Sequence, residues 1–195
     1  MMFDNVTTVC ASKYFNPQQL RQLHSKGVFH FGENQAQSLL KKVAELQDLP
    51  IHWHFIGHLQ TNKVKDIIEV IDTLHTLDRI KLAQEIQKHA KRPIDCFIQV
   101  NLTNEPQKSG VDPENLQQFL LEIKKYDKIN VVGLMTMGKD HDAQITEEAF
   151  RRLDELANAF HLPYRSMGMT DDYACALKHH TTHLRIGRKF LEWLD

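Results

Sequence analysis

Cysteine is scarce in this sequence, with three residues in 195 and no Cys-x-x-Cys pair. The three, Cys10, Cys96 and Cys175, are far apart in the chain. Two of them lie in apolar runs, where cysteine usually acts as a small buried hydrophobic residue. An odd, unpatterned set is typical of a reducing compartment, so we expect a cytoplasmic protein.

Long apolar runs and an excess of charge are also absent. No apolar stretch approaches 18 residues, and the first ten residues lack a basic region followed by an apolar run, so we expect no membrane span and no signal peptide. The formal net charge is -1, which gives no electrostatic reason to expect nucleic acid or a membrane surface as partner. With no linker in sight, residues 1–195 are predicted to form a single domain with a sizeable core.

What the chain does contain is an alternation of short apolar runs with amphipathic helical patterns, repeated eight times. The expected strands are residues 6–12, 28–31, 52–56, 73–76, 95–102, 130–135, 164–166 and 182–186. The expected helices begin at Asn16-Pro17 and cover 34–47, 61–71, 78–91, 113–126, 146–160, a short segment that Thr170 caps and that ends at Leu177, and Arg188 to the end. Eight such units predict an α/β protein with one (β/α)8 TIM barrel. An open doubly wound sheet is the alternative, but it predicts a glycine-rich loop after the first strand, and residues 12–15 are not glycine-rich.

Lys13 follows the first expected strand directly and precedes the helix start at Asn16-Pro17. A buried strand end desolvates an ammonium group and so favours the neutral, nucleophilic amine. We therefore interpret Lys13 as a candidate for Schiff-base chemistry with an aldehyde. The alternative is a lysine at a strand end whose amine simply reaches solvent.

The loops after the last two expected strands have the composition of a phosphate-binding site. In a barrel of this kind, phosphate often binds after strands seven and eight. Ser166 offers a hydroxyl, and Gly168 and Gly187 allow backbone N–H groups to approach an anion closely. Asp171 and Asp172 would repel phosphate, so we expect it to lie nearer Gly187. The alternative is that both glycines serve only turns and packing.

Arg185 alternates with Leu184 and Ile186 and so points to the opposite side of its strand. If that side is the barrel interior, its guanidinium shares a cavity with Lys13 and can hydrogen-bond a ring nitrogen. The alternative is a surface arginine paired with an acidic residue.

His52 and His54 lie two apart on one expected strand, so they point the same way and could ligate a metal. A barrel metal site needs further ligands from other strand ends. The fifth and sixth expected strands supply no histidine, and no aspartate ends the eighth. We therefore predict no metal and interpret these histidines as packing or hydrogen-bonding residues, with a metal-dependent hydrolase as the third hypothesis.

Taken together, these segments resemble the pyridoxal 5'-phosphate homeostasis proteins, the YggS/PROSC family. The segments that carry the resemblance are residues 9–13, 31–34, 53–63, 99–101, 108–110, 133–135, 166–171 and 185–187. The resemblance implies a barrel like the N-terminal domain of alanine racemase, with pyridoxal 5'-phosphate (PLP) as cofactor. It also implies that Lys13 carries PLP, that Arg185 faces the pyridine nitrogen, and that further residues line the cofactor site. These further residues are Ser166, Gly168 and Gly187 at the phosphate, with Asn34 and His54 nearby.

The sequence departs from this family in three places. The chain starts at the first strand without the helix that usually precedes it, and residues 189–195 replace the usual closing Phe-Gly segment. Arg188 stands where a small threonine usually binds phosphate. We expect the backbone N–H of Arg188 to reach the phosphate and its side chain to point into solvent, so that Arg188→Thr binds PLP as tightly or several-fold tighter.

The resemblance implies a non-catalytic carrier or regulator of PLP, a monomer, with PLP-dependent apoenzymes as candidate partners. A PLP-dependent, racemase-like enzyme acting on amino acids is the alternative. Alanine racemase needs a second domain and a second base, typically a tyrosine opposite the lysine. After the eighth expected strand only a short helix remains, so any second base would have to come from the barrel.

Overall fold

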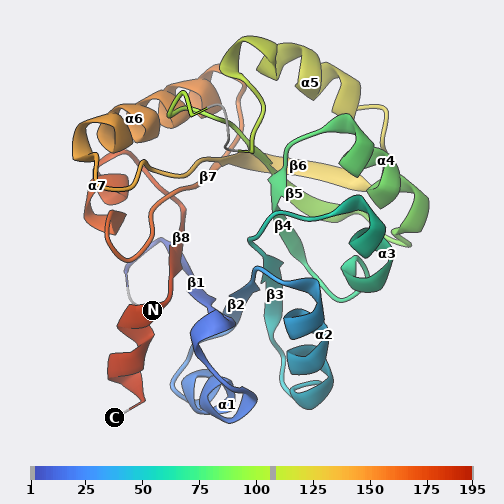
Figure 1. The fold of residues 1–195 in the computed structure, drawn as a ribbon, viewed down its shortest axis with the longest axis vertical. Helices are drawn as coiled ribbons and strands as arrows, with labels where there is room; N and C mark the ends of the chain where they lie inside the picture. Colours follow the sequence, from blue (N-terminus) through green and yellow to red (C-terminus); the bar gives the residue numbers. More distant parts are fainter. Residues whose placement is uncertain (1–2, 106–108, 195) are drawn as a thin grey trace.

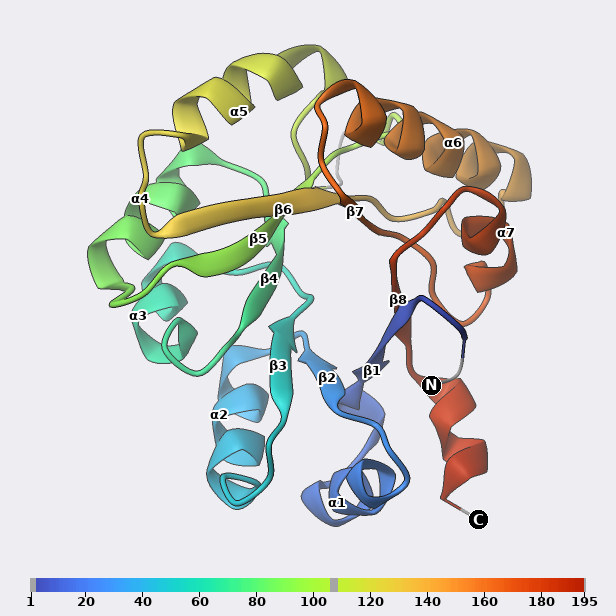
Figure 2. The same cartoon turned by 180° about the vertical axis from the view of Figure 1, so that it is seen from behind.

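The barrel is closed, and its strands follow one another in chain order. A computed structural model describes residues 3–105 and 109–194. Eight strands pair in the order β1 to β8, and β1 also pairs with β8 in parallel, so the predicted TIM barrel is confirmed (Figures 1 and 2). The strands are β1 Thr7–Ala11, β2 His30–Glu33, β3 His52–Phe55, β4 Thr73–Leu77, β5 Ile94–Gln99, β6 Ile129–Met135, β7 Tyr164–Ser166 and β8 His183–Ile186.

Helices surround the barrel on its outer face (Figure 1). The α-helices are α1 Pro17–Ser25, α2 Ala36–Glu45, α3 Val64–Ile67, α4 Ile80–His89, α5 Leu116–Ile123, α6 Ala143–Ala159 and α7 Tyr173–Lys178. Four 3-10 segments complete the set: η1 Ser12–Tyr14, η2 Thr61–Lys63, η3 Pro113–Asn115 and η4 Arg188–Trp193. No helix among residues 3–105 and 109–194 is long and apolar enough to cross a membrane.

The amphipathic pattern of each helix explains how it covers the barrel. Helix α4, for example, buries Leu82, Ala83 and Ile86, which recur at helical spacing on one face. Helix α1 starts with a capping box. The Gln19 backbone N–H donates to the Asn16 side chain, and the Asn16 backbone N–H donates to the Gln19 side chain. Local sequence signals therefore set the start of α1 and the buried face of α4.

Most element boundaries differ from the sequence prediction by a few residues, and four of the differences have a clear structural basis. The second strand runs to Glu33 because it pairs with β3 over its whole length. The helix expected over 61–71 is only η2 and α3, since Asp72 must already donate its N–H to the Trp53 carbonyl in the sheet. Thr170 caps no helix; α7 starts at Tyr173, and the Thr170 hydroxyl bonds to another loop. The last helix is the 3-10 segment η4 rather than an α-helix.

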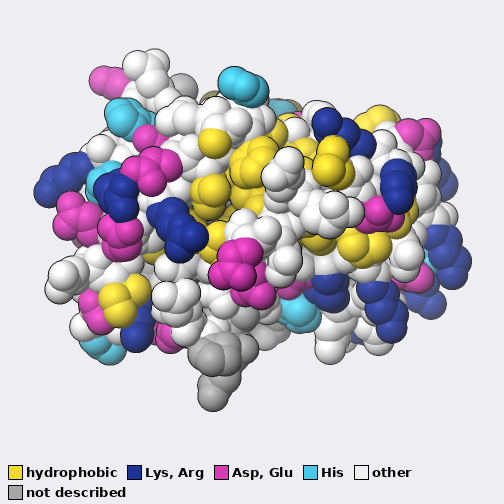
Figure 3. Space-filling model, turned by 90° about the horizontal axis from the view of Figure 1, so that it is seen from above, with side chains coloured by type: hydrophobic (Ala, Val, Ile, Leu, Met, Phe, Trp, Pro, Cys, Tyr) yellow, Lys and Arg dark blue, Asp and Glu magenta, His cyan; other side chains and the backbone are white. Residues whose placement is uncertain are grey.

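The outer surface carries one shallow apolar groove beside α5. Its lining includes Leu120, Leu121, Tyr126, Phe160 and Leu162, and Leu121 is half exposed. Figure 3 shows hydrophobic side chains exposed on this face of the molecule. The groove lies on the outside of the helical layer and so stands apart from the barrel mouth.

Candidate functional site

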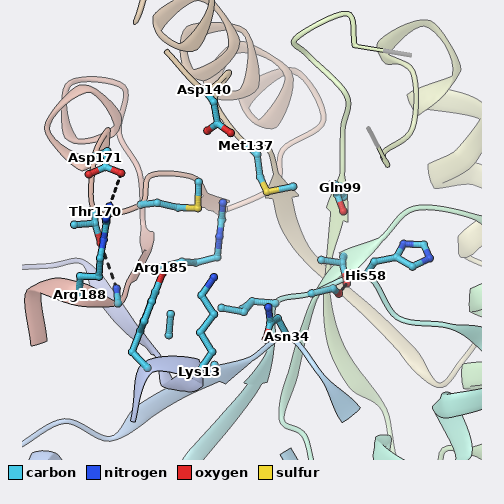
Figure 4. Close-up of a pocket in the computed structure, with 18 of the residues that line it drawn as sticks. Lys13, Asn34, His58, Gln99, Met137, Asp140, Thr170, Asp171, Arg185 and Arg188 are labelled. Carbon is cyan, nitrogen blue, oxygen red and sulfur yellow. Dashed lines mark hydrogen bonds and ion pairs between the residues drawn. The ribbon is translucent and has the colours of Figure 1, made fainter. Parts of the chain in front are cut away.

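A cavity of about 610 Å³ opens at the carboxyl ends of the strands (Figure 4). The end of every strand, or the loop after it, contributes to its lining. One lining residue for each strand in turn is Lys13, Asn34, Gly57, Thr76, Gln99, Met137, Thr170 and Arg185. The cavity thus lies where TIM-barrel proteins build their functional sites.

Lys13 lies on η1, a single 3-10 turn whose first residue, Ser12, is held by buried hydrogen bonds. The Ser12 hydroxyl is buried and donates toward the Gly32 carbonyl and the Glu33 carboxylate, both at 3.0 Å. The Lys42 ammonium group donates to the Ser12 carbonyl at 2.6 Å and pairs with Glu33 in the interior. These contacts fix the backbone of the turn, so the direction in which Lys13 leaves it is fixed as well.

The side chain of Lys13 enters the cavity on the side of Arg185 (Figure 4). Its nitrogen lies 5.0 Å from the centre of the Tyr14 ring. The residue is exposed, so the burial that the sequence predicted at this strand end is wrong. The strand stops at Ala11, and the turn carries Lys13 out of the buried layer.

Arg185 forms the floor of the same cavity. Its side chain is buried and donates to the Ser166 hydroxyl at 2.6 Å and to the Thr136 carbonyl at 3.1 Å. Burial lowers the pKa of the guanidinium to about 10, which leaves it charged at neutral pH. The interior placement predicted for Arg185 is confirmed, and the surface-arginine alternative is wrong.

Of the residues predicted to hold phosphate, Gly187 lines the cavity and the other two do not. Ser166 is fully buried, and its hydroxyl serves Arg185 and a histidine inside the barrel. Gly168 has φ +99°, and a Cβ there would lie 2.6 Å from the side chains of Ala176 and Leu184. These two are therefore interior and packing residues.

Thr170 takes the place that the sequence prediction gave to Ser166. It lines the cavity, and its hydroxyl accepts the Gly187 N–H at 3.4 Å (Figure 4). A Cβ at Gly187 would lie 2.3 Å from a carbon of the Tyr14 ring, so a larger residue there would displace that side chain. The sequence signal for Thr170 was a hydroxyl residue in the same loop, which we had interpreted as a helix cap.

Arg188 does not point freely into solvent, contrary to the sequence prediction. Its guanidinium pairs with the Asp171 carboxylate at 2.7 Å, and both residues line the cavity (Figure 4). The side chains are 55% and 84% exposed, so the pair forms part of the cavity rim. Asp140, which the sequence prediction missed, also lines this cavity.

Of the two remaining predicted residues, one lies in the cavity and the other lies inside the barrel. Asn34 lines the cavity, as expected for a residue near the cofactor. His54 is buried inside the barrel, bonds to other histidines and does not line the cavity. Within the part of the chain that the structure describes, no group of three His, Cys, Asp or Glu side chains could hold a metal ion. Lys108, part of one matching segment, lies outside the described residues.

Comparison with known proteins decides the family. The model of a family described as "Alanine racemase, N-terminal domain" matches residues 17–189. A pyridoxal phosphate homeostasis protein of Aquifex aeolicus is 41% identical over 187 residues, which cover 91% of this chain and 82% of that protein. The chain belongs to the pyridoxal phosphate homeostasis protein family. The resemblance stated from the sequence is confirmed.

Solved structures of similar proteins show the same architecture. PipY of Synechococcus elongatus without PLP is 31% identical with a TM-score of 0.89, over 94% of this chain and 91% of that one. PipY with PLP bound is 29% identical with a TM-score of 0.85, over 95% and 92%. An alanine racemase of Clostridium difficile is 11% identical, with a TM-score of 0.79 over 95% of this chain and 52% of that one, and shares the fold.

Proposed function

We propose that this protein holds PLP covalently on Lys13 and passes it to PLP-dependent apoenzymes in the cytoplasm, as a monomer and without turning over amino acids. Its role in PLP homeostasis follows from its family, whose members carry that name. PipY, with the same fold, has been solved with PLP bound. The observation that carries the proposal is one cavity in which the Lys13 amine faces the buried Arg185 guanidinium.

The cavity fits PLP in size and in chemistry. Its volume of about 610 Å³ lies within the roughly 300–1,000 Å³ usual for small-molecule sites. Lys13 offers a primary amine, and Arg185 offers a guanidinium at the floor. Thr170 offers a hydroxyl at one side of the cavity, beside Gly187, where a phosphate can lie.

PLP, when bound, supplies an aldehyde that a primary amine captures reversibly, and a ring that withdraws electrons strongly only when its nitrogen is protonated. Arg185 stays charged at neutral pH and can only donate hydrogen bonds. A ring nitrogen that it faces must therefore accept the hydrogen bond, and so it stays unprotonated. The exposed Lys13 lets an incoming amine reach the attachment point from solvent. A charged arginine at the floor and an open lysine at the rim suit storage and release better than catalysis.

Borohydride reduction of the PLP-loaded protein tests the attachment site. We expect peptide mass mapping to find a pyridoxyl group on Lys13, and Lys13→Ala to lose it along with the visible absorption band. Because Lys13 is exposed, the free energy of unfolding should change by no more than about 0.5 kcal/mol. Lys63→Ala is the matched control and should keep the label, whereas a label on Lys63 or Lys108 would contradict the assignment.

Racemase-like activity is the second candidate, because Tyr14 lines the cavity and a tyrosine is the usual second base. Tyr14 follows Lys13 on the same turn, however, and does not lie across the cavity from it. We expect racemisation or transamination of amino acids well below the roughly 1 per second at which ordinary enzymes start. Turnover above that rate that disappears in Lys13→Ala would overturn the carrier proposal.

A further inference from the structure

Histidines from β2, β3, β4 and β8 gather in the barrel below the floor of the cofactor cavity, together with an exposed one at the start of β3. They are His30, His52, His54, His75 and His183. His54 and His75 are buried, while His52 is exposed at the start of β3 and stacks on His30 with ring centres 4.9 Å apart. Buried histidines need hydrogen-bond partners, so the contacts of these rings show what they can do.

Three of these rings form a continuous hydrogen-bond chain that ends at Arg185. His30 Nδ1 lies 2.9 Å from His54 Nε2, and His54 Nδ1 lies 2.9 Å from His75 Nε2. His75 Nδ1 lies 2.7 Å from the Ser166 hydroxyl, which accepts from the Arg185 guanidinium at 2.6 Å. The chain thus joins β2, β3, β4, β7 and β8 beneath the cavity.

The environment keeps the middle of this chain neutral. Burial, and then the neighbouring histidines, hold the pKa of both His54 and His75 well below 6.5. Burial and His52 lower the pKa of His30 less, because Asp72 opposes them and the ring is only half buried. The charged and titratable groups facing the chain are His52, His54, His75, His183, Asp72 and Arg185. His30 is therefore the member that gains a proton first as the pH falls.

A chain of neutral imidazoles has two proton arrangements, because each ring carries one N–H. In the first, Ser166 O–H donates to His75 Nδ1, and each Nε2–H donates to the next ring, ending at His30 Nδ1. In the second, His30 Nδ1–H donates to His54, His54 Nδ1–H to His75, and His75 Nδ1–H to the Ser166 oxygen. Both arrangements satisfy every hydrogen bond between the rings.

Protonation of His30 selects between these arrangements. It adds one proton, which stays on His30 and places an N–H on both of its nitrogens, so His30 can only donate to His54. His54 and His75 each keep one proton but carry it on Nδ1. The Ser166 oxygen then accepts from His75 as well as from Arg185, and it no longer donates to His75. Its bond to Arg185 changes in strength, since linked hydrogen bonds polarise one another.

Solvent can reach His30 at the amino-terminal end of the barrel. His30 lines a second cavity, of about 150 Å³, together with Thr8, Phe29, Phe190 and Trp193. The Thr8 hydroxyl in the same lining is buried and has no hydrogen-bond partner within the protein. His30 is itself only partly buried, so its ring can exchange protons with solvent at this end of the chain.

We propose that His54 and His75 are positioning residues for Arg185, and that they transmit the protonation state of His30 at the amino-terminal end of the barrel through Ser166 to the floor of the cofactor cavity. This inference rests on the proposed function only in so far as PLP lies above Arg185. The proton coupling itself is a property of the protein without cofactor.

Nitrogen-15 NMR of histidine-labelled, PLP-free protein tests the coupling directly, because it reports which ring nitrogen carries the proton. Between about pH 7.5 and 4.5, we expect His54 and His75 to stay neutral and to change from one tautomer to the other with the same midpoint as His30. In His30→Leu, both tautomers should be independent of pH. If either ring keeps one tautomer while His30 titrates, the proposal is overturned.

The PLP-loaded protein tests the effect on the cofactor site. We expect the visible absorption of the natural protein to change with the His30 midpoint, and His54→Leu and His75→Leu each to lose this component. His75→Leu should also weaken PLP binding about threefold to tenfold, since Ser166 loses a hydrogen bond. His183→Leu is the matched control: it removes another interior ring, whose hydrogen bond goes to Thr182, and should keep the component.

An unchanged pH response in both His54→Leu and His75→Leu, or an equal loss in His183→Leu, would overturn the proposal. Failure of PLP to bind would instead overturn the proposed function, and it would leave the NMR result unaffected. The two failures are therefore distinguishable.

Discussion

Two ion pairs flank the cofactor cavity, and they have similar charges in opposite environments. Lys42 and Glu33 lie beneath the Lys13 turn with side chains 9% and 1% exposed. Arg188 and Asp171 lie at the rim of the cavity, 55% and 84% exposed. A buried pair is held in one geometry by its neighbours, whereas an exposed pair competes with water and salt. The comparison teaches that burial, and not the identity of the charges, decides what each pair can do.

The difference in burial suits the two ends of a bound cofactor, one attached covalently and the other held through its phosphate. The buried pair fixes the backbone of η1 through the Ser12 carbonyl, so the covalent attachment point has a constant position. The exposed pair can open at little cost, so the side of the cavity near Thr170 and Gly187 can adapt when a phosphate enters or leaves. The two pairs together therefore influence where the cofactor can be held.

Breaking the buried pair should have the largest effect. Lys42→Met leaves the Glu33 carboxylate buried without its cation, and we expect a loss of about 3–5 kcal/mol in the free energy of unfolding. Denaturation in urea, followed by circular dichroism, measures this loss. Borohydride labelling of Lys13 should fall as well, because the turn loses its anchor.

The double variant Lys42→Met with Glu33→Leu is the control for this prediction. Removing both charges leaves no buried ion, so we expect it to recover a large part of the lost stability. A loss below about 1 kcal/mol in Lys42→Met would show that the two pairs are equivalent and would break the comparison.

Changes at the exposed pair should have smaller effects, and the two variants should change PLP binding in opposite directions. Asp171→Asn frees the Arg188 guanidinium to face a phosphate, so we expect PLP to bind several-fold tighter. Arg188→Thr leaves the Asp171 carboxylate unpaired at the same rim, so we now expect several-fold weaker binding, in place of the tighter binding that the sequence suggested. A titration of PLP at fixed ionic strength measures both.

Salt sharpens this test, because exposed charges are screened over roughly 8–10 Å at physiological ionic strength. The difference between the two variants should shrink as salt is added. If Arg188→Thr binds more than about tenfold more weakly at every salt concentration, the arginine is a direct phosphate ligand, since an exposed pair alone is worth less.

Much of the fold could be predicted from the sequence because it depends on local pattern. Apolar runs such as 73–76 and helical stripes such as those of α4 mark their own elements. Their alternation allows few closed architectures. The element boundaries depend on tertiary contacts as well. The helix expected over 61–71 ends early as η2 and α3, because the Asp72 N–H bonds to the sheet.

The sequence by itself determined the barrel, the family, and the two residues at the centre of the site, Lys13 and Arg185. Strand period tells which side chains face the interior, so Arg185 could be placed. It does not tell how deep a side chain lies, because depth depends on how the strands are staggered around the barrel. The tertiary structure therefore decided that Ser166 and His54 lie beneath the cavity and Thr170 within it. It also decided the pairing of Lys42 with Glu33 and of Arg188 with Asp171, since each pair depends on how neighbouring elements pack against one another.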